Sequence, residues 1–282
     1  MQERGYAPIV EMETLQNTWI SRSSRRGRLW EVPVLSARRG GSAERLARSF
    51  GTLHPAVIFF LIMLAGLAAV ALLSIACGFL VTRVLEHAGG IGTSQEHFNS
   101  WLATHRTSTR TDASLVGSIV AGGVVLPIVT GTIALVCVIL RKWRIAAFVV
   151  FALAVESASY RITTLVVHSH RPRVVRLESL PVNASYPSGH TAASIAVYGG
   201  LVLLLTSRFT NAVFRSSAWM LAVGIVAFVA LARMYRGMHH PLDVAGGVLV
   251  GLAALTVIVF ACRTAGAAAE SRTEKRAEGG RA

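Results

Sequence analysis

The segment PAVIFFLIMLAGLAAVALLSIACGFLV, residues 55–81, decides the fold class of this protein. It contains no charged side chain, and a helix needs about 20 apolar residues to cross the hydrocarbon core of a bilayer. Pro55 stands where proline is favoured, in the first turn of a helix. The segment therefore predicts a membrane-spanning helix.

Further apolar blocks follow along the chain at residues 115–140, 145–167, 191–206, 219–232 and 242–262. The blocks 191–206 and 219–232 are shorter than a full span. Each meets a segment with His or Arg at one end, which indicates that its helix continues into a polar cavity. Together the blocks predict an all-α, polytopic membrane protein with a six-helix transmembrane bundle.

The composition supports this class, because charged residues make up only 15% of the chain and hydrophobic residues 53%. Soluble domains average about 25% charged residues. The net charge is +14, but no nucleic-acid-binding motif accompanies it and the arginines collect at block ends, so we expect no nucleic-acid partner. The three cysteines lie in apolar blocks without a CxxC pair, which indicates neither a zinc site nor a disulfide framework.

Two polar, basic segments flank the blocks. We expect residues 1–54 to form a disordered basic cytoplasmic arm, residues 55–262 a six-span domain, and residues 263–282 a disordered cytoplasmic tail. The loop RKWR (141–144) and the loop with Arg208 and Arg215 fall on the same side as both ends of the chain. Short basic loops face the cytoplasm. The sequence thus predicts a multi-pass protein of the cell membrane with both termini cytoplasmic.

The segments predicted to face outward, 82–114, 168–190 and 233–241, also carry arginines, against the usual charge bias. Histidines accompany them. The residues are Arg171, Arg173, Arg176, Arg233, Arg236, His168, His170, His190, His239 and His240. A bundle can bring these segments together at one end, so we expect an active site rich in Arg and His at the extracytoplasmic end.

The segment ARMYRGMHHPLD (232–243) predicts a nucleophile. His239 and Asp243 are four residues apart and share a face on a helix. A carboxylate that accepts from one imidazole nitrogen leaves the other nitrogen free to attack. Arg233, six residues before His239, is placed to hold the attacked anion.

The segment PSGH (187–190) predicts a phosphate site at a helix start, where free N–H groups and Ser188 and Gly189 hold oxygens. His190 would protonate the leaving oxygen as general acid. Arg171, in HRP (170–172), would be a second clamp. Such a set transfers a phosphoryl group without a metal, so we expect neither a metal nor another cofactor.

RP at 171–172, PSGH at 187–190 and R-x5-H-x3-D at 233–243 resemble the three signature motifs of the type-2 phosphatidic acid phosphatase superfamily. This family includes membrane lipid phosphatases and soluble vanadium haloperoxidases, and the resemblance covers about residues 55–262. It implies a phosphohistidine intermediate on His239, oriented by Asp243, with His190 as the acid. It implies phosphate contacts from Arg171, Ser188, Gly189 and Arg233.

Two positions depart from the family's pattern. Thr164 stands where the first motif begins with Lys, and Ala232 stands where the third usually opens with Ser. Arg161 lies one turn before Thr164 on the same helix face, and we hypothesise that its long side chain replaces the missing charge. Unchanged turnover in an Arg161→Ala variant would contradict this.

The resemblance implies an integral membrane lipid phosphatase that acts on a polyprenyl diphosphate or a phosphatidic acid-like lipid at the outer face of the bilayer. A lipid phosphotransferase, in which the phosphoryl group passes to an acceptor alcohol, would use the same residues. A third interpretation is a lipid-binding membrane protein with a degenerate site, which the departure at Thr164 allows.

Overall fold

A computed structural model of the protein describes residues 32–51 and 53–279. Within these ranges, five helices are long and apolar enough to cross a membrane, and a pair bent by 42° makes a sixth if it is one span. The spans are α3 (Pro55–Arg83), the bent pair α5 (Ser108–Val120) and α6 (Val125–Ile139), α7 (Trp143–Val166), the run α8 (Gly189–Ser194), η3 (Ile195–Gly199) and α9 (Gly200–Thr206), α10 (Ala212–Tyr235) and α11 (Pro241–Gly279). The all-α, multi-span fold predicted from the sequence is confirmed.

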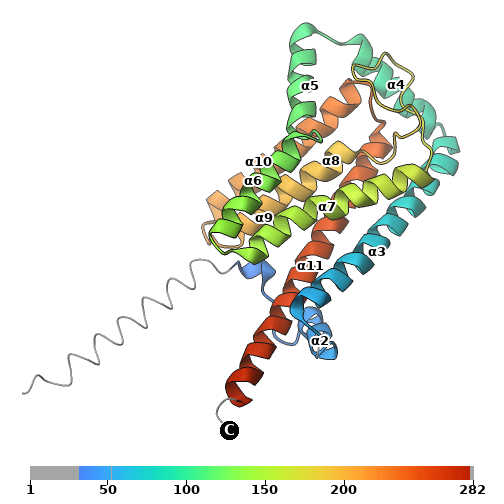
Figure 1. Ribbon diagram of the computed structural model, residues 1–282. Helices are drawn as coiled ribbons and strands as arrows, with labels where there is room; N and C mark the ends of the chain where they lie inside the picture. The colour runs from blue at the N-terminus through green and yellow to red at the C-terminus, as the bar shows by residue number, and fades with distance from the viewer. Residues whose placement is uncertain (1–31, 52, 280–282) are drawn as a thin grey trace, which may run out of the picture.

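The helices pack as one bundle in which α11 runs the whole length and lies against α3 and α7 (Figure 1). The largest buried cluster includes Phe59 of α3, Phe148 of α7 and Ile258 of α11. Gly251 permits close approach of α11 to α8, because a Cβ there would lie 2.7 Å from the carbonyl oxygen of Ala192. Small residues at such crossings let membrane helices pack tightly.

The fourth and fifth spans are longer or more enclosed than the short apolar blocks predict. The run from Gly189 to Thr206 is the most enclosed span, with 61% of its apolar window buried, which explains how a short block is accommodated. One π-helical turn, η3, interrupts it. Helix α10 extends beyond the predicted block 219–232 at both ends, since polar residues such as Arg215 are compatible with helix near a membrane interface.

One end of the bundle is closed by segments that connect the spans. These are η2 (Leu85–His87), α4 (Ile91–Thr104) and a stretch that we call the capping loop, residues 167–187 (Figure 1). A β-bridge between Ser169 and Ala184 folds the capping loop back on itself. The three segments predicted to face outward therefore gather at one end of the bundle. That this end is extracytoplasmic stays a prediction.

The opposite end differs from the disordered arm and tail that the sequence predicts. Within the arm, η1 (Pro33–Leu35) and α2 (Ser42–Ser49) are ordered, and Ala47 of α2 packs against Ala267 and Ala268. Helix α11 continues past residue 262 to Gly279, since the segment AGAAAESRTEK is rich in strong helix formers. Residues 1–31 and 280–282 of the predicted arm and tail lie outside the described residues.

Candidate active site

The predicted site residues come together at the end of the bundle closed by the capping loop. His190 lies in the first turn of α8, Arg233 in the last turn of α10, and Asp243 in the first turn of α11. His239 lies in the short connection between α10 and α11 and is only 3% exposed, while Arg233 and Asp243 are fully buried. Chain segments far apart in sequence thus contribute buried residues to one end of the bundle.

The tautomer of His239 follows from its contact with the main chain. Nδ1 lies 2.7 Å from the carbonyl oxygen of Ser185, which only accepts hydrogen bonds, so Nδ1 carries the proton. Burial and the positive charges of Arg233 and Arg171 hold the pKa of His239 well below its ordinary value. The neutral ring therefore keeps a lone pair on Nε2, the property that a nucleophile needs.

Asp243 supports His239 less directly than the sequence predicts. Its Oδ2 lies 3.9 Å from Nδ1 of His239, too far for a hydrogen bond. Instead Oδ2 accepts the Ser185 hydroxyl at 2.6 Å and the main-chain N–H of His240 at 2.8 Å. The second contact is the N3-to-N-cap bond of a capping box, and it draws the carboxylate toward the start of α11. Asp243 thus fixes Ser185, and the Ser185 carbonyl fixes His239.

The start of α8 has the form predicted for PSGH. Ser188 is the N-cap residue, and its main-chain N–H donates to the carbonyl oxygen of Asp243 at 2.8 Å, which ties α8 to α11. Gly189 allows α8 to approach α7, because a Cβ there would lie 3.2 Å from the ring of Tyr160. His190 is half-buried in the first turn of α8. The first turn of α8, with His190, therefore lies beside the start of α11.

Arg233 is held on one side only. Its Nη1 donates to the Ser118 hydroxyl and, at 2.7 Å, to Oε2 of Glu178. Its Nε and Nη2 are buried and make no hydrogen bond within residues 32–51 and 53–279. Glu178 was not predicted, although it is the sole acidic residue between positions 168 and 190. A single acidic residue among several arginines is the feature of the sequence that indicates Glu178 as a partner of these arginines.

Glu178 also accepts from Nε of Arg236 at 2.6 Å and from the Ser118 hydroxyl at 2.7 Å. Burial opposes its ionisation, but the charge of Arg233 and the hydrogen bonds from Arg233, Ser118 and Arg236 lower the pKa of Glu178 to about 2. The carboxylate is therefore ionised throughout the physiological range and bridges two arginines.

Arg171, predicted to contact phosphate, acts as a tie within the capping loop. Its Nε donates to the carbonyl oxygen of Pro181 at 2.8 Å and its Nη2 to that of Ala184 at 2.9 Å. Its Nη1 donates to the carbonyl oxygen of Met238, next to His239. The terminal nitrogens each retain a second N–H, and the charge of Arg171 acts on His239.

Thr164, which stands in place of the first motif's lysine, and Arg161, proposed to replace its charge, lie apart from the contacts of His239 and Arg233. Thr164 donates its hydroxyl to the carbonyl oxygen of Arg161 at 3.0 Å, and the Arg161 side chain is exposed on α7. Neither makes a hydrogen bond or ion pair with His239 or Arg233 in the part of the chain that the structure describes. The charge replacement by Arg161 stays a prediction, while Arg236 is a cation that the structure does bring near Arg233 through Glu178.

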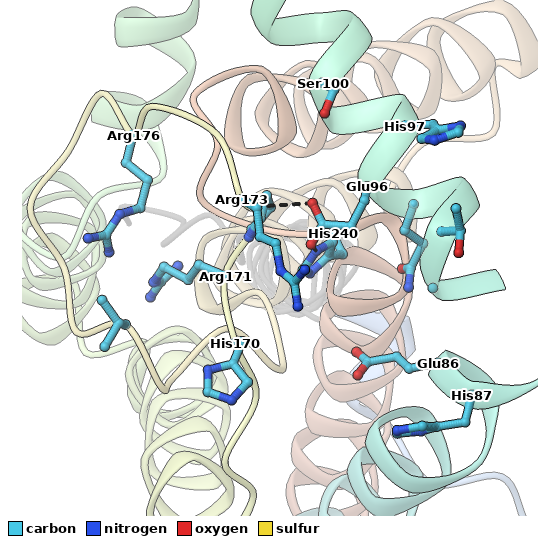
Figure 2. Close-up of a pocket in the computed structure, with 15 residues that line it drawn as sticks. Glu86, His87, Glu96, His97, Ser100, His170, Arg171, Arg173, Arg176 and His240 are labelled. Atoms are coloured by element: carbon cyan, nitrogen blue, oxygen red, sulfur yellow. Dashed lines mark hydrogen bonds and ion pairs between the residues drawn. The ribbon is translucent and has the colours of Figure 1, made fainter. Parts of the chain in front are cut away.

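A cleft of about 900 Å³ opens beside the enclosed residues. Figure 2 shows His170, Arg171, Arg173 and Arg176 of the capping loop facing Glu86 and Glu96 across it, with a dashed line from Arg173 to Glu96. His240 lines the cleft and lies 3.2 Å from Glu96. Burial opposes its charging, but Asp243 and Glu96 raise the pKa of His240. Among the described residues, no cluster of three or more His, Cys, Asp or Glu side chains could hold a metal ion.

Comparison with known proteins connects this geometry to a family. Residues 145–265 match the PAP2 superfamily. The chain is 35% identical over 116 residues to an undecaprenyl-diphosphatase of Sulfolobus acidocaldarius, covering 39% of this chain and 51% of that protein. It is 33% identical over 79 residues to a probable diacylglycerol pyrophosphate phosphatase 1 of Schizosaccharomyces pombe, covering 26% of this chain and 28% of that protein. The chain thus spans about half of the first relative's length and less of the second's.

The fold has a solved counterpart. The crystal structure of a transmembrane PAP2 type phosphatidylglycerolphosphate phosphatase from Bacillus subtilis superposes with a TM-score of 0.56 at 18% sequence identity, covering 72% of this chain and 93% of that chain. The matched region 145–265 contains Arg171, His190 and His239, the residues that carry the three motifs. Residues 145–265 of this chain therefore match the PAP2 superfamily, and they lie within a transmembrane helical bundle.

Proposed function

We propose that this protein is an integral membrane lipid phosphatase that hydrolyses a lipid phosphate or diphosphate through a phosphohistidine intermediate. One observation carries the proposal. The Ser185 carbonyl holds Nδ1 of a buried, neutral His239, which leaves Nε2 as a nucleophile among the cations Arg171 and Arg233.

The proposed reaction has two steps. Nε2 of His239 attacks phosphorus, the bond from phosphorus to the lipid-side oxygen breaks, and His190 gives its proton to that oxygen. Arg233 and the first-turn N–H groups of α8 stabilise the charge on the other phosphate oxygens. A water molecule, deprotonated by His190, then attacks phosphorus and releases phosphate, which returns both histidines to their starting states.

The proposed substrates are lipids because the site lies at the end of a bundle of apolar helices. The two relatives are named for diphosphates of a polyprenol and of diacylglycerol. A polyprenyl diphosphate or a phosphatidic acid-like lipid therefore suits this chain. We propose an extracytoplasmic site and cytoplasmic termini, as the basic loops at 141–144 and 208–215 indicate.

Phosphate release by the purified full-length protein in detergent tests the proposal. Substrates would be a polyprenyl diphosphate, phosphatidic acid and a diacylglycerol diphosphate, with His239→Ala as the control. We expect release from at least one lipid, and acid-labile, base-stable labelling of the wild-type protein by substrate labelled in the transferred phosphate. Equal release by His239→Ala would sink the mechanism. Product analysis with an added lipid alcohol separates hydrolysis from phosphotransfer, and absence of both leaves the lipid-binding interpretation.

A further inference from the structure

We propose that Glu178 is a positioning residue that anchors one side of the Arg233 guanidinium and thereby aims its opposite edge at the substrate's phosphate. This rests on the proposed function, since it assigns Arg233 to phosphate. Glu178 does not touch the reacting atoms in this scheme and acts through Arg233.

The anchored side is Nη1. It donates to Oε2 of Glu178 at 2.7 Å and to the Ser118 hydroxyl, so a carboxylate and a hydroxyl from two different segments hold the same nitrogen. Charge-assisted bonds of this kind are shorter and stronger than neutral ones. Arg233 is fully buried and the Glu178 side chain is 24% exposed, so solvent reaches only the carboxylate end of these bonds.

The aimed side is the edge formed by Nε and Nη2. Both nitrogens are buried, and neither has a hydrogen-bond partner among the described residues. Buried N–H groups are nearly always paired in folded proteins, so two adjacent orphans on one guanidinium mark a place where a ligand's acceptors belong. The two N–H groups of this edge are parallel and match two oxygens of a phosphate.

Glu178 is itself rigidly held, as an anchor must be. Oε1 accepts from Nε of Arg236 at 2.6 Å and from the Ser118 hydroxyl at 2.7 Å. Arg236 in turn donates to the Ser114 hydroxyl and to the carbonyl oxygen of Leu177, each at 3.1 Å. The anchor therefore joins α5, α10 and the capping loop, and contacts from all three set the position of Arg233.

The charges fit the same role. Arg233 and Arg236 share one carboxylate, which reduces the repulsion between them and leaves the cluster with a net positive charge for an anion. A rival interpretation is that Glu178 occupies the phosphate's place and must leave before the substrate binds. The carboxylate contacts Nη1 and leaves the Nε–Nη2 edge untouched, which favours anchoring over competition.

Vanadate binding to the full-length protein in detergent, measured by calorimetry, tests the proposal without requiring turnover. The variants are Glu178→Ala, Glu178→Gln and Glu178→Asp, and the matched control is Asp112→Ala, an exposed acid on α5 at the same end. We expect Glu178→Ala to weaken vanadate binding and raise KM by about tenfold or more, because a buried charge pair is truncated. Glu178→Asp should recover part of the loss, and Asp112→Ala should match the wild type.

A double-mutant cycle separates positioning from general stability. If Glu178 acts through Arg233, adding Glu178→Ala to Arg233→Ala should weaken vanadate binding little further, so the two losses are far from additive. Additive losses, or tighter vanadate binding in Glu178→Ala, would overturn the proposal. If Glu178→Ala fails to fold, Glu178→Gln takes its place, because the amide keeps the shape but loses the charge and one of the two acceptor oxygens that hold Arg233 and Arg236. Vanadate binding should still weaken, and normal binding by that variant at an unchanged Tm would overturn the proposal. Full activity in both Arg233→Ala and His239→Ala would instead refute the proposed function.

Discussion

The Nδ1 nitrogen of His239 lies 2.7 Å from the main-chain oxygen of Ser185, whereas the carboxylate of Asp243 lies 3.9 Å from it. A main-chain acceptor thus sets the tautomer of the candidate nucleophile, and the carboxylate acts one step further away by holding the Ser185 hydroxyl. A substitution of the Asp243 or Ser185 side chain does not remove this main-chain oxygen. It should therefore reduce, and not abolish, the fixed orientation of the His239 ring.

The first prediction follows from this arrangement. Asp243→Asn replaces the charged oxygen that accepts from Ser185 and from the His240 N–H by a neutral amide oxygen, which weakens both hydrogen bonds. We expect a loss of about 1 kcal/mol of stability from the weakened helix cap and a fall in kcat through a less well-fixed His239. Thermal unfolding and phosphate release measure the two effects. A variant with wild-type kcat would show that Asp243 serves the helix alone.

The second prediction concerns His190 and depends on the leaving group. His190→Ala should lower kcat on a lipid phosphate by about 100- to 10,000-fold, because an alkoxide leaves poorly without a proton. The loss should be much smaller for 4-nitrophenyl phosphate, whose phenolate leaves unprotonated. Because His190 also deprotonates the water of the second step, the measurement compares the first-turnover rate of leaving-group release for the two substrates in both proteins. An equal loss on both would contradict the role of general acid.

The third prediction concerns protonation of His239. Burial and the nearby arginines lower its pKa, so the ring should stay neutral at pH values where an ordinary histidine, with a pKa of about 6.5, is half protonated. Ring ¹⁵N chemical shifts in detergent, assigned with His239→Ala, report this directly. The unfolded chain takes up the proton first, so the free energy of unfolding should fall as pH drops below that ordinary value. Protonation of the ring near pH 6.5 would refute the assignment.

The fourth prediction concerns the tie made by Arg171. Arg171→Lys keeps the charge but loses the planar group that reaches three carbonyl oxygens, so the capping loop should open more often. We expect a raised KM and faster proteolysis within residues 167–187. Arg173→Lys, which alters an exposed arginine of the same loop, is the matched control. Equal proteolysis rates for the two variants would argue against the tie.

The fifth prediction concerns helix packing. Gly251→Leu places a side chain against the carbonyl of Ala192, so α8 must move away from α11 and carry His190 with it. Both Tm and kcat should fall. Gly224 on α10 has open space around it, so Gly224→Ala should leave both close to wild type or slightly raise Tm. A Gly251→Leu protein with normal Tm would show that the crossing is loosely packed.

The sequence predicts the helices and the meeting of the motifs because both depend on patterns within the chain. Apolar blocks report spans directly, and the arginines at 171, 233 and 236 stand out against the charge bias. The sequence predicts a disordered tail where α11 continues to Gly279, because an alanine-rich helix without an apolar stripe resembles a linker in composition.

The supporting contacts were beyond sequence reasoning for a different reason. Ser118 meets Arg233 from 115 positions away, and nothing in either segment specifies the pairing. The contact of the Ser185 carbonyl cannot be recognised in the sequence, because every residue has a main-chain carbonyl. Asp243 shows the limit of spacing rules, since a helix start offers its carboxylate a second partner in the main-chain N–H of His240.

The unbroken course of α11 fixes a relationship between compartments. Its 39 residues, at about 1.5 Å each, extend roughly 58 Å, well beyond a hydrocarbon core of about 30 Å. Asp243 stands in its first turn and Gly279 at its last, so we expect the candidate catalytic centre and the far end of this helix to emerge on opposite faces of the bilayer whichever way the bundle is inserted. A reporter fused after Gly279 would therefore show which face of the membrane carries the candidate catalytic centre, because it marks the opposite face and lies far from that centre.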